Sequence, residues 1–335
     1  KRLFLIFFSI LILGGDGYFV SAQGTVSAWK AGVSEVIITP GQNMWMAGYG
    51  ARDKPSEGTL HELRAKALAL EDASGKKAVL VTTDILGFPK GMSDRIRDRL
   101  DKEYKLSRAQ VILNSSHTHT GPVLEDALYD IYPLDEVELK KIQEYSKSLE
   151  KKIVELVGEA LDNLKPAKVY SNNGVVRFQV NRRNNTEALL DRQTSLNGPN
   201  DYAVPVIRVE DEKGDLLAVA FGYACHPTVL SFYQWSGDYP GFAQLELEKS
   251  YPGAKMLFFQ GAGADMNPIP RRSVELARQY GRELAAAVER VLNEDMNELK
   301  PSLLFDYDEV TLSLTGIPDK EELKNIAEKS SGYNQ

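Results

Sequence analysis

The chain has 335 residues, of which 43% are hydrophobic and 26% charged, with a formal net charge of −7. This composition predicts a folded globular core and excludes a largely disordered chain. The acidic balance and the lack of a basic, aromatic-rich patch argue against nucleic acid as a partner, because phosphate backbones attract basic surfaces.

The first 22 residues follow the pattern of a secretory signal peptide. Lys1-Arg2 precede a short apolar run, and Val20-Ser21-Ala22 supply a small-x-small cleavage pattern before Gln23. We therefore expect an exported protein, secreted or periplasmic, whose mature chain begins at Gln23. The alternative is that the first 22 residues are not cleaved and act as a membrane anchor. Because Cys225 is the single cysteine, an internal disulfide is excluded and stability must come from the core.

Strand-like and helix-like segments alternate along the rest of the chain, without an internal repeat or a convincing linker. Short apolar runs predict strands, and apolar residues spaced three or four apart predict helices. In chain order we expect a strand at 78–83, a helix at 92–104, a strand at 110–115, a long helix at 138–164, a hairpin of strands 204–209 and 216–225, a strand at 255–260 and a helix capped by Ser273. This alternation predicts a single large α/β domain over residues 23–335, with mixed β-sheets flanked by α-helices.

Two of the four histidines lie two positions apart, in the segment Ser116-His117-Thr118-His119-Thr120-Gly121-Pro122. They directly follow the strand predicted at 110–115, which we expect to be buried. Side chains at i and i+2 share one face of extended backbone, so both imidazoles should point in the same direction. Imidazole is a common metal ligand and transfers protons well near pH 7. The pattern therefore predicts a metal or proton-transfer site; the alternative is one capping and one exposed histidine.

Three more polar side chains follow predicted strands: Asp84, His226 and Asp265. Because ligands bind beyond the carboxyl ends of strands in such sheets, we expect them to lie near His117. Histidine and carboxylate ligands outside the cell suit zinc, and a catalytic zinc keeps one position open for water. Beside it, an unbound histidine can move protons and a guanidinium, such as that of Arg182, can stabilise an oxyanion.

Other hydrolase classes fit the sequence less well. Metallo-β-lactamase-like enzymes need His-x-His-x-Asp-His, but here Thr120-Gly121 follow His119. Amidohydrolase barrels need two further histidines downstream, and only His226 is present. A Ser-His-Asp mechanism lacks its Gly-x-Ser-x-Gly elbow. Cys225 lies in an apolar strand, which is typical of a buried core residue rather than a nucleophile.

Taken together, these motifs resemble the N-terminal catalytic domain of the neutral/alkaline (non-lysosomal) ceramidase family. The most specific elements are His117-Thr118-His119-Thr120-Gly121-Pro122 and His226-Pro227-Thr228, in this order. Further matching segments cover most of the mature chain, at 31–40, 46–49, 60–67, 180–182, 236–238 and 259–265. The resemblance implies two stacked mixed sheets covered by helices.

The same resemblance implies a Zn²⁺-dependent amidase that splits ceramide into a fatty acid and a sphingoid base. By position, His117 and His226 correspond to zinc ligands, and His119 and Arg182 to residues that line the reaction centre. His61 and Asp238 lie in matching segments and receive only supporting roles, and Asp84 and Asp265, which follow predicted strands, are further possible supporting residues. We therefore expect a small-molecule or lipid N-acyl substrate, with peripheral membrane contact as an open alternative; the sequence leaves the oligomeric state open.

Two departures from the family pattern affect these expectations. Where the family has Gly-Asp-Val-Ser-Pro-Asn with a catalytic serine, this chain has Asn267, whose amide can orient water or substrate but cannot act as a nucleophile. This favours a zinc-activated water. The family's remaining zinc ligands, a glutamate and a tyrosine, have no match, and we expect them beyond Gln335, with the sequence a fragment of a longer chain.

Three hypotheses follow from the sequence. The first is an exported zinc-dependent hydrolase of ceramide or a related N-acyl lipid. The second is a hydrolase of the same fold that acts on a non-lipid acylated substrate, such as an acylated sugar or peptide. The third, favoured by Asn267, is a homologue that binds metal and ligand but has lost catalysis.

Overall fold

The computed structural model describes residues 29–330 except 315 and 317. The signal peptide predicted at residues 1–22 lies outside the described residues. Within the described part of the chain, no helix is long and apolar enough to cross a bilayer.

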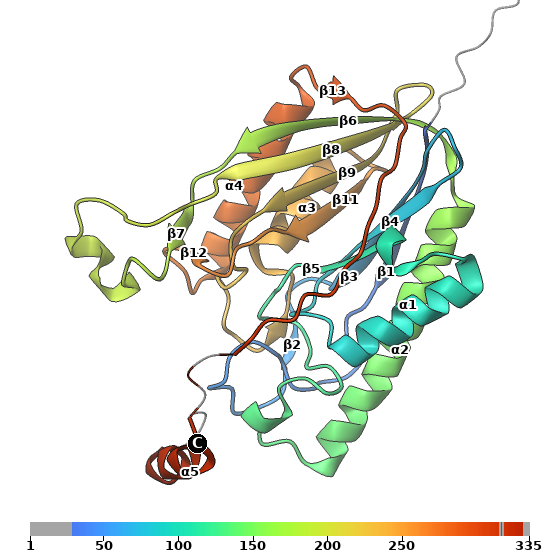
Figure 1. Ribbon diagram of the computed structural model, residues 1–335. Helices are drawn as coiled ribbons and strands as arrows, with labels where there is room; N and C mark the ends of the chain where they lie inside the picture. Colours follow the sequence, from blue (N-terminus) through green and yellow to red (C-terminus); the bar gives the residue numbers. More distant parts are fainter. Residues whose placement is uncertain (1–28, 315, 317, 331–335) are drawn as a thin grey trace, which may run out of the picture.

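Nine strands form one mixed sheet, in the order β11-β9-β8-β6-β1-β3-β4-β5, with β13 paired to β6 (Figure 1). The strands are β1 (Trp29–Ile37), β3 (Arg64–Glu71), β4 (Lys77–Thr83), β5 (Val111–Ser115), β6 (Lys165–Val175), β8 (Ala203–Asp211), β9 (Leu216–Tyr223), β11 (Lys255–Gln260) and β13 (Asn297–Glu298). Two pairs are parallel, β4 with β5 and β9 with β11. A helix connects each of these pairs, as parallel pairing requires: α1 (Lys90–Tyr104) and α3 (Asp238–Ser250).

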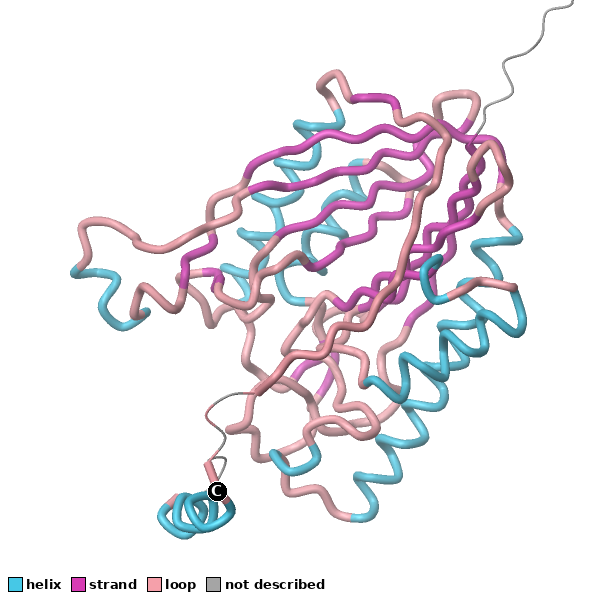
Figure 2. Tube along the Cα trace, in the orientation of Figure 1, coloured by secondary structure: helices cyan, strands magenta, loops and turns pink. Residues whose placement is uncertain are grey.

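The sheet turns back on itself between β6 and β1, so that its two halves stack as two layers. An apolar cluster between the layers includes Leu68 of β3 from one half and Val209 of β8 and Leu257 of β11 from the other. At the open side, the Asn114 side chain of β5 bonds to both backbone groups of Gln260 in β11, at 3.3 and 2.9 Å. The two stacked sheets expected from the resemblance are therefore two layers of one continuous sheet (Figure 2).

Helices cover the outer face of each layer. The helices α1 and α2 (Glu136–Asp162) pack Ile96 and Ile153 against the layer formed by β1, β3, β4 and β5. On the other layer, α3 and α4 (Val274–Leu292) pack Leu247 and Leu284 against β8, β9 and β11. Strands β9 and β11, which are covered on both faces, have almost continuously apolar sequences, and this made them recognisable.

The predicted elements agree with the observed ones, including the Ser273 cap, whose Oγ accepts from the Leu276 N–H at 3.2 Å. One expectation is wrong: β5 is an edge strand rather than a buried one, and its Ile112 side chain is 60% exposed. The sequence also did not predict four strands of the sheet, β1, β3, β6 and β13, or the helix α3. It likewise missed two short ribbons, β2 (Gly58–Thr59) with β10 (Gln234–Trp235) and β7 (Gln179–Asn181) with β12 (Met266–Pro268), and the terminal helix α5 (Lys320–Lys329).

Candidate metal centre

The segment after β5 places His117 and His119 beyond the carboxyl end of the β4/β5 pair. The His117 N–H donates to the Ile85 carbonyl at 3.0 Å, and its φ of 64° lies in the left-handed region. The predicted extended geometry of the histidine pair is therefore wrong, because the chain leaves the sheet at Ser115. Backbone in this strained region at a non-glycine residue is typical of functional sites.

His226 reaches the same place from the other layer, beyond the end of β9. Its N–H donates to the Met266 carbonyl at 2.9 Å, which anchors it to β12. Strand β12 pairs with β7 so that Asn267 lies opposite Val180. The ribbon thereby brings Asn267 and the start of the Arg182 loop to the side of His226.

The imidazoles of His117, His119 and His226 form one cluster, here called the histidine cluster. Each offers a ring nitrogen, and these nitrogens all lie within 4.8 Å of one another. In the described part of the chain, no other group of three or more His, Cys, Asp or Glu side chains converges in this way. The ring centroids of His117 and His226 are 4.8 Å apart, and that of His119 lies 5.2 and 5.4 Å from them.

Two backbone carbonyls fix the tautomers of two of these rings. His117 Nδ1 donates to the Leu86 carbonyl at 2.6 Å, and His226 Nδ1 donates to the Gly263 carbonyl at 3.2 Å. A carbonyl can only accept, so in the neutral rings each Nε2 carries a bare lone pair. The two Nε2 atoms face each other at 3.1 Å.

Two facing lone pairs repel each other unless a cation or a proton lies between them. Metal-binding histidines are ordinarily held in this way, with the second ring nitrogen donating to a carbonyl or carboxylate. Two nitrogens bound tetrahedrally to zinc at about 2.0–2.1 Å lie roughly 3.4 Å apart, close to the separation observed here. The donor set and its orientation therefore fit a transition metal such as zinc.

His119 completes the cluster without any fixed partner. Both of its ring nitrogens are shielded from solvent and make no hydrogen bond within the described residues. The ring lies beside Tyr49, with centroids 4.9 Å apart, and the His119 carbonyl accepts from the Arg52 guanidinium at 2.7 Å. A ring held in place with both nitrogens free fits either a third ligand or a proton-transfer residue.

Burial keeps the imidazoles of His119 and His226 neutral. Burial, reinforced by His117 and His226, lowers the pKa of His119 to about 3. Burial and the neighbouring His117 lower the pKa of His226 to about 4. At neutral pH both rings therefore offer lone pairs rather than positive charge, as metal ligands require.

Two predicted supporting carboxylates serve the fold around the cluster rather than joining it. Asp84 accepts from the Arg64 N–H at 3.0 Å, and Asp238 accepts from the Leu230 N–H at 2.8 Å and so holds the loop that follows His226. Burial raises the pKa of each carboxyl to about 6. Asp84 does not join the histidine cluster as expected, because its Oδ2 accepts from the Arg64 backbone N–H.

Asp265 also lies outside the cluster. Its side chain is exposed and forms an ion pair with Arg183 at 3.1 Å, while its carbonyl accepts from the Arg182 N–H at 2.7 Å. The Arg182 guanidinium is exposed at the edge of the site, and its charge helps to lower the pKa of His226. Asp265 therefore positions the arginine loop rather than binding with the histidines.

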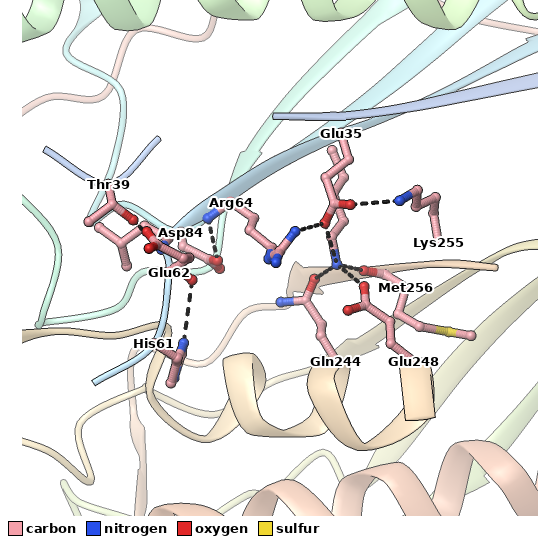
Figure 3. A network of polar contacts seen from close by, with 12 residues as sticks. Glu35, Thr39, His61, Glu62, Arg64, Asp84, Gln244, Glu248, Lys255 and Met256 are labelled. Carbon is pink, nitrogen blue, oxygen red and sulfur yellow. Dashed lines mark hydrogen bonds and ion pairs between the residues drawn. The ribbon is translucent and has the colours of Figure 1, made fainter. Parts of the chain in front are cut away.

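His61 belongs to a different polar region, drawn in Figure 3. Its Nδ1 donates to the Glu62 carbonyl at 3.4 Å and its ring packs on Phe242, at a centroid distance of 5.0 Å. Beside it, the ammonium of Lys66, whose side chain is 1% exposed, forms what is here called the Lys66 network. The Lys66 Nζ lies at these distances from its oxygen partners: Glu248 at 2.6 Å, the Met256 carbonyl at 2.7 Å, Gln244 at 3.0 Å and Glu35 at 3.6 Å.

The structure also reveals site residues that the sequence did not single out. Arg52, 5% exposed, holds the His119 carbonyl, and the Tyr49 ring covers His119. Arg271 donates to Thr228 Oγ1 at 3.4 Å and pairs with Glu187. Tyr49 lay within a segment that carried the resemblance, but no local pattern marked either arginine.

The fold and the cluster define an α/β domain with a candidate histidine metal site at the carboxyl ends of its strands. Residues 29–267 match the family described as "Neutral/alkaline non-lysosomal ceramidase, N-terminal". The chain belongs to this family, as the sequence motifs predicted.

Relatives and solved structures agree with this assignment. The chain is 26% identical to neutral ceramidase A of Dictyostelium discoideum over 307 residues, covering 81% of this chain and 42% of that protein. It is also 26% identical to a neutral ceramidase of Oryza sativa subsp. japonica, covering 67% of this chain and 29% of that protein. The structure of the neutral ceramidase from Pseudomonas aeruginosa matches the fold with a TM-score of 0.69, at 21% identity, over 82% of this chain and 46% of that one. The chain thus spans less than half the length of these relatives.

Proposed function

We propose that this protein is a metal-dependent hydrolase of N-acyl amides, of the ceramidase type, with zinc as its ion. The observation that carries the proposal is the pair of bare Nε2 lone pairs of His117 and His226, 3.1 Å apart and fixed by backbone carbonyls. Family membership supports an amide as the bond that is cleaved. A bound zinc would supply a Lewis acid that activates water and polarises a carbonyl.

In this proposal the side chains around the cluster have separate roles. His117 and His226 hold the ion. His119, neutral and with both ring nitrogens free, accepts a proton from the attacking water and delivers it to the departing amine nitrogen. The water oxygen bonds to the carbonyl carbon, the C–N bond breaks, and a carboxylic acid and an amine leave; the acid then gives its proton to the amine or to solvent.

Arg182 and Asn267 complete the proposed site. Arg182 supplies positive charge to the developing oxyanion or to a polar group of the substrate. Asn267, 5% exposed, lies with its Oδ1 3.5 Å from Thr228 Oγ1, and its amide orients water or substrate. We further propose that the protein acts outside the cytoplasm, on the signal-peptide pattern of residues 1–22.

Metal analysis combined with hydrolysis assays tests these roles in the full chain. We expect His117→Ala to lose both zinc and hydrolysis. We expect His119→Ala to retain zinc and to lose hydrolysis by about 10²–10⁴-fold, the usual contribution of a proton-transfer residue. Full zinc content in His117→Ala would contradict the ligand assignment. Loss of zinc in His119→Ala would instead make His119 the third ligand.

A further inference from the structure

The His119 ring is placed without a hydrogen bond of its own. Its two nitrogens have no partner within the described residues, whereas backbone carbonyls fix the rings of His117 and His226. The position of the His119 ring therefore depends on its own backbone and on the side chains packed against it. Tyr49 is one of these, with its ring centroid 4.9 Å from that of His119. A proton-transfer group of this kind needs other residues to hold it in place.

Arg52 holds the backbone of His119. Its Nη2 donates to the His119 carbonyl at 2.7 Å, and its Nη1 donates to the Phe232 carbonyl at 3.1 Å. The His119 N–H in turn donates to the Pro227 carbonyl at 3.4 Å. The planar fork of a guanidinium allows one side chain to bond two carbonyls at once. Arg52 thus joins the His119 segment to the loop that follows His226.

The same guanidinium contacts the side chain that covers the His119 ring. The Arg52 Cζ atom lies 5.4 Å from the centroid of the Tyr49 ring and 5.2 Å from that of the Tyr233 ring. Aromatic faces attract cations, and more strongly when both groups are desolvated. Tyr49 is fixed at its other end, where its hydroxyl donates to the Leu230 carbonyl at 3.0 Å. The backbone of His119 and the tyrosine that covers its ring are therefore both held by Arg52.

Arg52 differs from Lys66, the other buried cation discussed above, in having no acidic partner. Its side chain belongs to a residue that is 5% exposed, and no carboxylate in the described part of the chain lies close enough to affect its charge. Lys66, in contrast, pairs with Glu248 at 2.6 Å. A buried cation without an opposite charge costs stability, and an apolar side chain could fill the same space without this cost. The placement of Arg52 is thus better explained by its effect on His119 than by support of the fold alone.

We infer that Arg52 is a positioning residue, which holds the His119 ring at the place from which it transfers protons. This inference rests on the proposed function and assigns Arg52 no contact with the substrate or the ion. Displacement of a catalytic group by about 1 Å costs on the order of 100-fold in rate. Loss of Arg52 therefore slows the chemical step and leaves substrate affinity and metal content unchanged.

Kinetics of Arg52→Met and Arg97→Met in the full chain test this role. Arg97 is a matched control, because its guanidinium donates to the Arg108 and Val111 carbonyls at 3.0 and 2.7 Å and lies 5.8 Å from the Tyr307 ring centroid. It contacts the start of β5, whereas the histidine cluster lies beyond the end of that strand. For an N-acyl substrate, we expect Arg52→Met to lower kcat about 100-fold, with KM changed less than about twofold and zinc retained. Arg97→Met should change kcat less than about twofold.

Arg52→Lys keeps the test decisive if Arg52→Met does not fold. The lysine ammonium retains the charge but lacks the planar fork, so it cannot hold both carbonyls in the same geometry. We expect part of the rate to return, with kcat about tenfold below wild type. A wild-type kcat in Arg52→Lys would overturn the inference, and so would an equal loss of kcat in Arg52→Met and Arg97→Met. Loss of zinc or a raised KM with unchanged kcat in Arg52→Met would overturn it too.

The histidine ring signals in the NMR spectrum separate this inference from the proposed function. We expect Arg52→Lys to shift the ring signals of His119 and to leave those of His61 in place, and Arg97→Lys to shift neither. If no N-acyl amide is hydrolysed but this pattern is observed, the proposed function fails and Arg52 still positions His119. If the wild-type chain hydrolyses amides but the His119 signals do not move in Arg52→Lys, the inference is overturned while the hydrolase remains.

Discussion

The histidine cluster and the Lys66 network are both shielded polar regions, but they differ in how their polar atoms are satisfied. The Lys66 ammonium has three hydrogen-bond acceptors and a second carboxylate beside it, which matches the three donors it carries (Figure 3). The His119 ring has two shielded nitrogens and no partner within the described residues.

This difference indicates which region serves the fold and which serves chemistry. A network whose hydrogen-bonding groups are all paired gains no further stability from a ligand. The Lys66 network therefore serves to hold β3, α3 and β11 together. Unsatisfied nitrogens cost stability in the free protein and recover it when an ion or a substrate binds. His119 therefore has the features of a reactive group. A search for functional residues by burial alone would have selected Lys66 instead.

The largest effect that we expect comes from Lys66→Met. Burial would raise the pKa of Glu35, but its hydrogen bond from Lys255 and the charges of Lys66 and Arg64 outweigh burial and lower it. Removal of the ammonium leaves Glu35 and Glu248 without their shared cation, which should lower the free energy of unfolding by about 3–5 kcal/mol. Urea denaturation measures this loss.

Lys30→Met is the matched control for this variant. Lys30 pairs with Glu71 at 2.7 Å, but its side chain is 50% exposed, so its removal should cost less than about 1 kcal/mol. Zinc bound per folded molecule should be unchanged in both variants. Equal losses of stability would mean that the Lys66 network contributes no more than a surface ion pair.

Gly48→Ala should disturb the histidine cluster with a smaller effect. A Cβ at Gly48 would lie 2.5 Å from Cγ and Nδ1 of His119, so the ring must move. Displacement of a catalytic group by about 1 Å costs on the order of 100-fold in rate. We expect kcat for an N-acyl substrate to fall by about this factor, and the His119 ring signals to shift in the NMR spectrum.

Gly75→Ala provides the control for backbone strain. Gly75 also has a positive φ, 81° against 104° at Gly48, but a Cβ there would meet nothing within 4 Å. Both variants should lose about 1–2 kcal/mol of stability from left-handed backbone, and only Gly48→Ala should lose activity. If activity falls equally in both, the cause is general strain and not contact with His119.

The smallest expected effect is a difference in pH dependence. Burial lowers the pKa of His226 from the ordinary value of 6.5 to about 4, so the unfolded metal-free chain takes up a proton before the folded chain does. As pH falls from about 7.5 to 5, wild type should lose about 1–2 kcal/mol more unfolding free energy than His226→Ala, as thermal or urea unfolding would show. The raised pKa values of Asp84 and Asp238 act in the opposite direction but equally in both proteins. Parallel pH profiles would mean that the His226 imidazole is not held neutral by the fold.

Several strands and helices were predictable because their apolar spacing is local, whereas β1, β3, β6 and α3 were not predicted. The apolar residues 255–260 and the Ser273 cap each determine one element with little help from distant residues. The pairing of the two layers was not predictable, because Asn114 and Gln260 meet through a contact that spans 146 positions. For the same reason the edge position of β5 could not be predicted from its apolar sequence.

The site was predictable where strand ends coincide with scarce residue types. His117 and His226 stood out as histidines after strands, and they meet as expected. Asp84 shared the same signal, but the sequence could not show that its oxygens are directed to the Arg64 N–H. Arg52 contributes through a guanidinium that reaches the His119 carbonyl across 67 positions, which no local pattern encodes.

The stacking of one sheet on itself also has a consequence for how the site forms during folding. His117 and His226 are 109 positions apart, and each belongs to a different layer. Closing so long a loop costs chain entropy before any contact compensates, so such contacts form late. A chain with only one finished layer holds either the His117–His119 pair or His226 alone. Metal binding at the proposed site would therefore report that both layers have docked. It would distinguish the native protein from collapsed intermediates that already contain most of its secondary structure.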